Sequence, residues 1–177
     1  MSTREPGCAV GAGAGISMVR GPAENFVLSG FRAQVAAVAD CPSLPDTTLP
    51  LISAKAVAIE LAAFMAVLKQ CAACPLSAFR PDDLRLNRDE LLVLALVAAL
   101  QHGDDEAAVL AASTLTCAAR VCETLQSAAG LAMLLKASGA LLLPVSAPTL
   151  RALTDPEHSE TRGASARVTP LTKRTSP

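Results

Sequence analysis

The feature that most constrains this chain is a long aliphatic stretch between Asn87 and Gly139, in which the only His is His102 and the only Cys are Cys117 and Cys122. The run from Leu91 to Leu100 is apolar on every side, which is typical of a central helix covered by its neighbours. Enzyme sites need polar, titratable side chains that converge in a pocket, and this stretch offers few. The sequence therefore predicts an all-α core, no catalytic residues and no enzymatic activity.

Composition narrows the classes of function further. Of 177 residues, 51% are hydrophobic and 18% are charged, which indicates one domain with tails rather than global disorder. Only 2% are aromatic, although aromatic side chains dominate binding hot spots and stack nucleobases. With a net charge of −1, the chain has no bulk attraction for nucleic acid or anionic membranes. We therefore do not expect it to bind nucleic acid.

Neither a membrane span nor an export signal is predicted. A spanning helix needs about 20 consecutive apolar residues, but the longest apolar runs are interrupted by Lys55 and Glu60 or by Lys136. Glu5 and Pro6 stand where a secretory signal would carry basic residues. Six Cys at uneven spacing then indicate reduced thiols. We expect a cytoplasmic protein that is not integral to a membrane.

The chain divides into three parts by composition. Residues 1–47 are rich in Gly, Ala, Pro and Ser and predict a mostly irregular N-terminal arm, with a possible short helix over 25–39 that Gly30 interrupts. Residues 48–145 predict the helical domain. Residues 146–177 are dominated by Ser, Thr, Pro and Arg and predict a disordered tail. The expected fold is a small four- to five-helix bundle with disordered N- and C-terminal tails.

The first helix of the bundle is predicted over about 51–71. One face carries apolar residues at the spacing of a buried stripe, namely Val57, Leu61, Phe64 and Leu68. A second face carries small residues, namely Ala54, Ala58, Ala62 and Ala66. Because small side chains let another helix approach closely, this Ala stripe is a candidate contact surface.

Capping residues predict where the next helices begin and end. Asn87 with Glu90 resembles a capping box, and Gly103 is a natural stop for the helix that follows. Asp104 and Asp105 suit the start of a third helix. That helix extends to about Cys117 and a fourth covers about 118–138, and the sequence leaves open whether the two are continuous.

Four cysteines raise a thiol alternative. Cys71 and Cys74 form a CxxC, and Cys117 and Cys122 could supply two further zinc ligands. The CxxC falls at a predicted helix C-terminus, where the helix dipole does not favour a thiolate. The other reading is that these cysteines act as small hydrophobic residues. No other residue is a candidate metal ligand, and no cofactor is expected.

Two resemblances accompany these patterns. From Leu86, the string LNRDELLVLALVAALQHGDDEAA resembles the start of the helix-turn-helix domain of quorum-sensing and response-regulator transcription factors. That resemblance implies a DNA-binding regulator, but recognition helices present polar and basic residues to the major groove. The matching stretch from Val109 to Leu115 contains no Lys or Arg, so a degenerate domain is the form that fits.

Residues 55–145 also resemble small uncharacterised helical proteins of high-GC alphaproteobacteria. The resemblance is carried by the CxxC, the RDELL helix start, the turn from Gln101 to Asp104 and the Ala/Leu-rich closing helix. It implies a bacterial, cytoplasmic, all-α protein and no particular activity.

Together these observations predict a non-enzymatic protein-protein interaction or regulatory module. A small bundle buries a limited fraction of its surface, so an exposed aliphatic surface is expected, and exposed apolar patches mark partner sites. We expect a homodimer or a protein partner bound through the Ala stripe or the closing helix. The alternatives are a degenerate helix-turn-helix regulator and a thiol or zinc protein that uses the CxxC.

Overall fold

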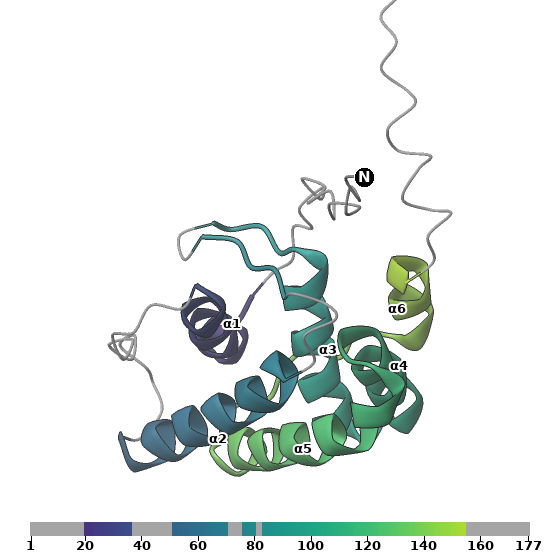
Figure 1. The fold of residues 1–177 in the computed structure, drawn as a ribbon. Coiled ribbons are helices and arrows are strands. Elements are labelled where there is room, and N and C mark those ends of the chain that lie inside the picture. Colours follow the sequence, from purple (N-terminus) through teal and green to yellow (C-terminus); the bar gives the residue numbers. More distant parts are fainter. Residues whose placement is uncertain (1–19, 37–50, 71–75, 81–82, 155–177) are drawn as a thin grey trace, which may run out of the picture.

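A computed structural model describes residues 20–36, 51–70, 76–80 and 83–154 (Figure 1), and the side chains of residues 51–53 are not described. Helices make up the regular structure, and the described part of the chain contains no β-strand, so the all-α prediction is confirmed. The helices are α1 (Pro22–Val35), α2 (Leu51–Lys69), α3 (Arg88–His102), α4 (Asp105–Leu115), the short 3-10 helix η1 (Ala118–Arg120), α5 (Val121–Ala137) and α6 (Ala147–Thr154).

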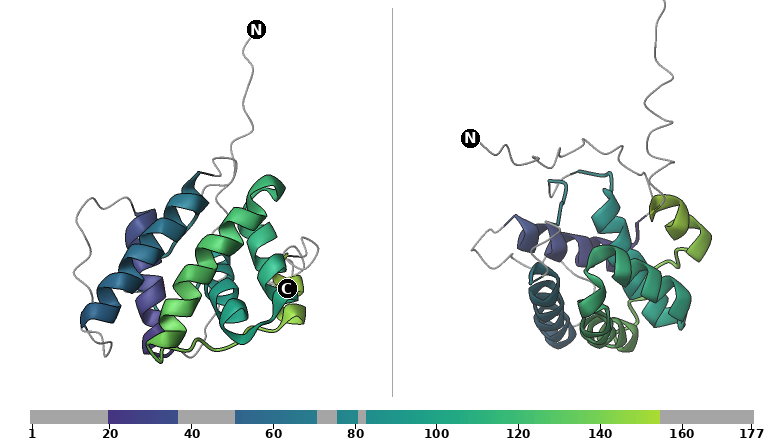
Figure 2. Two further views of the ribbon diagram at one scale, coloured as in Figure 1. Left: turned by 90° about the horizontal axis from the view of Figure 1, so that it is seen from below. Right: turned by 45° about the vertical axis from the view of Figure 1, so that its right-hand side comes forward.

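Helix α3 is surrounded by other helices, and two of these form an outer layer. Helices α2 and α5 lie side by side and form one outer layer, which faces the viewer in the left panel of Figure 2. Helix α3 packs behind α5 and contacts α1 and α4, while α6 covers part of α4. A single apolar core connects all of these helices.

Helix α3 is the centre of the bundle, as its apolar sequence predicts. Every residue from Leu91 to Ala99 is buried. Its start is fixed by the predicted capping box, because Asn87 Oδ1 accepts a hydrogen bond from the Glu90 amide at 2.8 Å and Glu90 Oε2 accepts one from the Asn87 amide at 2.9 Å. Gly103 ends the helix with a φ of 73°, a left-handed conformation that favours glycine.

The closing helices form two rods rather than one. Helix α4 begins at the predicted Asp104 cap, whose Oδ1 accepts a hydrogen bond from the Ala107 amide at 3.0 Å. It ends at Leu115, because Thr116 is extended at φ −135° and ψ 168°. The chain then makes the η1 turn before α5 begins. Helices α4 and α5 are therefore not continuous, which the sequence leaves open.

The helical core extends beyond the predicted 48–145 in both directions. Helix α1 lies within the segment predicted to be a mostly irregular arm, and Phe26, Val27, Leu28 and Phe31 are buried in the core. It starts before the predicted 25 and ends before the predicted 39. Gly30 does not interrupt it, because α1 crosses α2 there and a Cβ on Gly30 would collide with Cδ2 of Leu61. Burial against α2 therefore outweighs the low helix propensity of glycine.

At the other end, the predicted tail contains a helix. Helix α6 lies within 146–177, and its residues Ala147 and Leu150 are buried. The helix packs against α4, so tertiary contact rather than a strong local pattern explains it. Residues 1–19 and 155–177, where disordered tails are predicted, lie outside the described residues.

One buried hydroxyl gives a stability prediction. Thr124 on α5 is fully buried, and its Oγ1 has no hydrogen-bond partner among the residues that the structure describes. The isosteric change Thr124→Val removes this unsatisfied group, so we expect it to raise the free energy of unfolding by about 1 kcal/mol. Chemical denaturation followed by circular dichroism measures the change. Thr116→Val is the matched control, because Thr116 is buried but donates its hydroxyl proton to the Cys117 carbonyl at 3.0 Å. Equal destabilisation by both substitutions would contradict the prediction.

Candidate functional site

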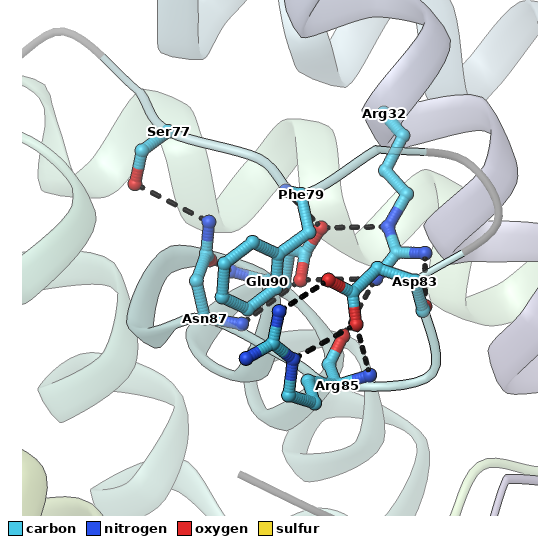
Figure 3. Close-up of polar contacts among 7 residues, drawn as sticks. All are labelled: Arg32, Ser77, Phe79, Asp83, Arg85, Asn87 and Glu90. Carbon is cyan, nitrogen blue, oxygen red and sulfur yellow. Dashed lines mark hydrogen bonds and ion pairs between the residues drawn. The ribbon is translucent and has the colours of Figure 1, made fainter. Parts of the chain in front are cut away.

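The most extensive polar cluster lies where α1, α3 and the connection between α2 and α3 meet (Figure 3). Arg32 Nε contacts Glu90 Oε1 at 2.7 Å and Arg32 Nη2 contacts Glu90 Oε2 at 3.2 Å. Only 3% of the Arg32 side chain and none of the Glu90 side chain is exposed. The two residues form a buried, bidentate ion pair that joins α1 to α3.

The same two side chains also hold the connection that precedes α3. Arg32 Nη1 donates to the Asp83 carbonyl at 2.8 Å, and Arg32 Nη2 donates to the Arg85 carbonyl at 2.9 Å. Glu90 Oε1 accepts a hydrogen bond from the Phe79 amide at 3.0 Å. The carboxylate therefore bonds to a guanidinium and to two backbone amides. These contacts tie α1, α3 and the connection before α3 together.

A second, exposed ion pair lies at the edge of this cluster. Hydrogen bonds from the Arg85 side chain and amide lower the pKa of Asp83 to about 2, and the charge of Arg85 acts in the same direction. The Arg85 guanidinium stacks over the Phe79 ring, 5.2 Å from its centroid. Because the carboxylate is charged near neutral pH and already paired, it stiffens the turn rather than acting as a proton donor.

Gln101 organises the opposite end of the bundle. It is buried, and its Nε2 donates to the carbonyls of Ala132 at 3.5 Å and Ala140 at 2.9 Å. Its Oε1 accepts a hydrogen bond from the Leu142 amide at 2.9 Å. Glu24 of α1 completes the arrangement by accepting from the Leu143 amide at 2.8 Å. These side chains fix the segment that follows α5, and they too serve the fold.

The structure describes two of the four cysteines of the predicted thiol site. Cys71 and Cys74 lie outside the described residues, whereas Cys117 is exposed just before η1 and Cys122 is exposed in the first turn of α5. Arg120 lies between them in the chain, and its Nη2 donates to Gln70 Oε1 at 2.7 Å. Within the described ranges, no three His, Cys, Asp or Glu side chains come together as potential metal ligands.

The helix that would read DNA has an acidic exposed face. Asp105, Glu106 and Val109 of α4 are exposed, and Ala107 and Ala108 are buried. Helix α4 contains no Lys or Arg. This face does not favour the major groove, where recognition helices present polar and basic residues.

The α2/α5 layer exposes two large apolar side chains, one on each helix. Ile59 of α2 is 60% exposed and Met133 of α5 is 72% exposed. We define the outer face by the exposed residues Lys55, Ile59, Ala62, Ala63 and Ala66 of α2 and Gln126, Met133 and Ala137 of α5.

Two contacts fix the register of the two helices in this layer. Glu60 lies beside Gly130, and Gln70 bonds to Arg120, so the helices are antiparallel. Because Glu60 is level with Gly130, Ile59 and Met133 fall within about a turn of each other along the layer.

The outer face matches part of the predicted Ala stripe. Ala62 and Ala66 are exposed, but Ala58 is half-buried and Ala54 is buried, so the stripe runs from solvent into the core. Neither Ile59 nor Met133 belongs to the predicted Ala stripe, although Met133 lies on the closing helix, which is also a predicted contact surface. A helical projection around the buried stripe would have placed Ile59 opposite the core, because it follows the buried Val57 by two residues, or about 200°.

Among the helices in the described ranges, none has both the length and the apolar character needed to cross a membrane. No protein-family model, curated protein or solved structure matches the chain.

Proposed function

We propose that this protein is a non-enzymatic interaction module and that two copies associate through the outer face. The observation that carries the proposal is the exposure of Ile59 and Met133, two large apolar side chains, on neighbouring helices of one layer. Removal of apolar surface from water is the main driving force of protein association, and exposed apolar patches are common partner sites.

The small residues of the outer face support a helical occupant. Ala62, Ala63 and Ala66 leave the α2 backbone open to close approach by another helix. With 19 residues in α2, the two-helix layer measures about 28 by 20 Å, which is of the same order as the roughly 800 Å² that each partner buries in a specific complex. A second copy presents the same face and forms an isologous dimer, the commonest form of symmetric assembly.

Non-enzymatic function is part of the proposal because the clustered titratable side chains are engaged in holding the fold. Arg32 and Glu90 bond to each other and to the backbone, and Asp83 is paired with Arg85. The proposed location is the cytoplasm, which the uneven spacing of the six cysteines supports because it indicates reduced thiols.

Light scattering coupled to size exclusion tests the proposal. We expect the full chain to elute with about twice its 18.1 kDa mass, and Ile59→Asp to elute as a monomer because it introduces a charge into the contact. Val109→Asp is the matched control, since Val109 is an aliphatic residue of α4 that is 49% exposed outside the outer face. A wild-type chain that stays monomeric at high concentration, or dissociation by Val109→Asp alone, would count against the outer face.

A second candidate is the thiol or zinc protein. The observation that favours it is the bond between Gln70, which directly precedes Cys71 in the chain, and Arg120, which lies between Cys117 and Cys122. Metal analysis of the purified protein, with thiol titration before and after chelation, tests this candidate. Stoichiometric zinc that is lost in Cys117→Ser and Cys122→Ser would support it, and fully titratable thiols without metal would exclude it.

A further inference from the structure

Two opposite charges on α2 lack partners within the described chain. Lys55 is exposed and Glu60 is half-buried, and neither makes a hydrogen bond or an ion pair with any described residue. The other charged side chains of the α2/α5 layer are engaged. Lys69 donates to Gln34, Lys136 donates to the Gln101 carbonyl, and Glu123 pairs with Arg120.

Lys55 and Glu60 cannot satisfy each other within one helix. They are five residues apart, which places them about 140° apart around α2, whereas side chains meet at spacings of three or four. Ile59 lies between them on the helix surface. Within the described ranges, one copy therefore presents a cation and an anion without partners on the two flanks of an exposed isoleucine.

Helix α5 makes room for the carboxylate of Glu60. Gly130 lies beside it, and a Cβ on Gly130 would lie 2.8 Å from Glu60 Oε2. Glycine inside a helix costs about 1 kcal/mol of helix propensity relative to alanine. The carboxylate consequently lies at the seam between α2 and α5, next to the outer face, where a docking partner would further desolvate it.

We propose that the two copies pair so that Lys55 of each copy contacts Glu60 of the other, on either side of a two-fold axis close to Ile59. This inference rests on the proposed function, because it names the partner of the same face. Covering an unpaired carboxylate is costly, so the surface that docks here has to bring a cation. In a symmetric dimer the contact between Lys55 and Glu60 occurs twice. Because each copy carries both charges beside Ile59, a second copy supplies the cation that Glu60 needs.

Charge reversal provides the test, using the full chain at low ionic strength, where exposed charges are least screened. Lys55→Glu and Glu60→Lys each bring like charges together twice in a homodimer. We expect each single variant to raise the dimer dissociation constant at least tenfold in sedimentation velocity. The double variant restores both pairs, and we expect its dissociation constant to lie within about threefold of the wild-type value. Thermal unfolding by circular dichroism checks that each variant is folded.

Mixing the two single variants tests the pairing of Lys55 with Glu60 more sharply than either variant alone. An equimolar mixture of Lys55→Glu and Glu60→Lys copies can form a heterodimer in which both contacts are again attractive. We therefore expect the mixture to dimerise at concentrations at which each variant alone is monomeric. Lys69→Glu makes the same charge change elsewhere on α2, and we expect it to leave the dissociation constant within threefold.

The outcomes separate this inference from the proposed function. If Ile59→Asp dissociates the dimer but the single charge reversals do not, or the mixture fails to dimerise, the pairing of Lys55 with Glu60 is wrong and the outer face stands. If the wild-type chain is monomeric at every concentration, both proposals fail.

Discussion

Arg32→Ala is expected to lower the free energy of unfolding by about 3–5 kcal/mol, because it leaves the carboxylate of Glu90 buried without its cation. None of the Glu90 side chain is exposed. The same substitution removes the two hydrogen bonds that Arg32 donates to the Asp83 and Arg85 carbonyls. Helix α1 and the connection before α3 therefore lose their common anchor.

Urea denaturation of wild type and variant measures the effect. The double variant Arg32→Met, Glu90→Gln removes both charges together and keeps a side-chain oxygen for the Phe79 or Asn87 amide. We expect it to cost less than Arg32→Ala, because no unpaired charge remains in the core. Arg151→Ala is the control for an exposed ion pair, since Arg151 and its partner Glu106 are 55% and 65% exposed, and we expect a change of at most about 1 kcal/mol. An Arg32→Ala variant as stable as Arg151→Ala would contradict the structural role of the buried pair.

Gln101→Met should lower the free energy of unfolding by about 3 kcal/mol, because it keeps the length of the side chain but leaves backbone groups at the end of α5 without partners. The Leu142 amide and the Ala140 carbonyl each lose a 2.9 Å hydrogen bond. Leu142 itself is buried in the core, so water can replace these bonds only if the segment opens.

Hydrogen exchange locates this effect as well as measuring it. In Gln101→Met we expect faster exchange of the Leu142 amide, while amides at the centre of α3 follow only the global loss of stability. Gln34→Met is the control, because Gln34 contacts Lys69 at the surface, and we expect a change within about 0.5 kcal/mol. Unchanged exchange at Leu142 in Gln101→Met would show that the hydrogen bonds of Gln101 do not hold this segment.

The sequence predicted those parts of the fold that depend on local pattern. The helix boundaries at Asn87 and Gly103 follow from capping chemistry within a few residues of the chain, and the central position of α3 follows from its uniformly apolar composition. The Asp104 cap was predictable for the same reason.

Contacts between distant residues were not predictable in this way. The local pattern predicts Glu90 as half of a capping box, but its buried partner Arg32 lies 58 residues away. Helix α1 is predicted with an interruption at Gly30, and only the crossing with α2 explains why a glycine belongs there. Helix α6 is short, and its burial depends on α4.

The sequence predicts that α2 carries a contact surface, but it does not predict which residues of the neighbouring helix complete it. A surplus of apolar side chains and the Ala stripe indicated a contact surface, and Ala62 and Ala66 are exposed as that interpretation requires. The neighbouring helix that completes the outer face depends on the antiparallel register of α2 and α5. That register rests on Glu60 beside Gly130 and on Gln70 bound to Arg120, and no local pattern predicts either contact.

The methyl group of Met133 reports most directly on whether the outer face is a contact surface. Met133 is 72% exposed in the single chain, whereas Met65 is fully buried and serves as the internal reference. With methyl-labelled methionine and a soluble paramagnetic agent, we expect the Met133 signal to be protected at high protein concentration. Its relaxation should increase on dilution and in Ile59→Asp. A Met133 methyl that is equally accessible at every concentration and in both proteins would contradict association through this face.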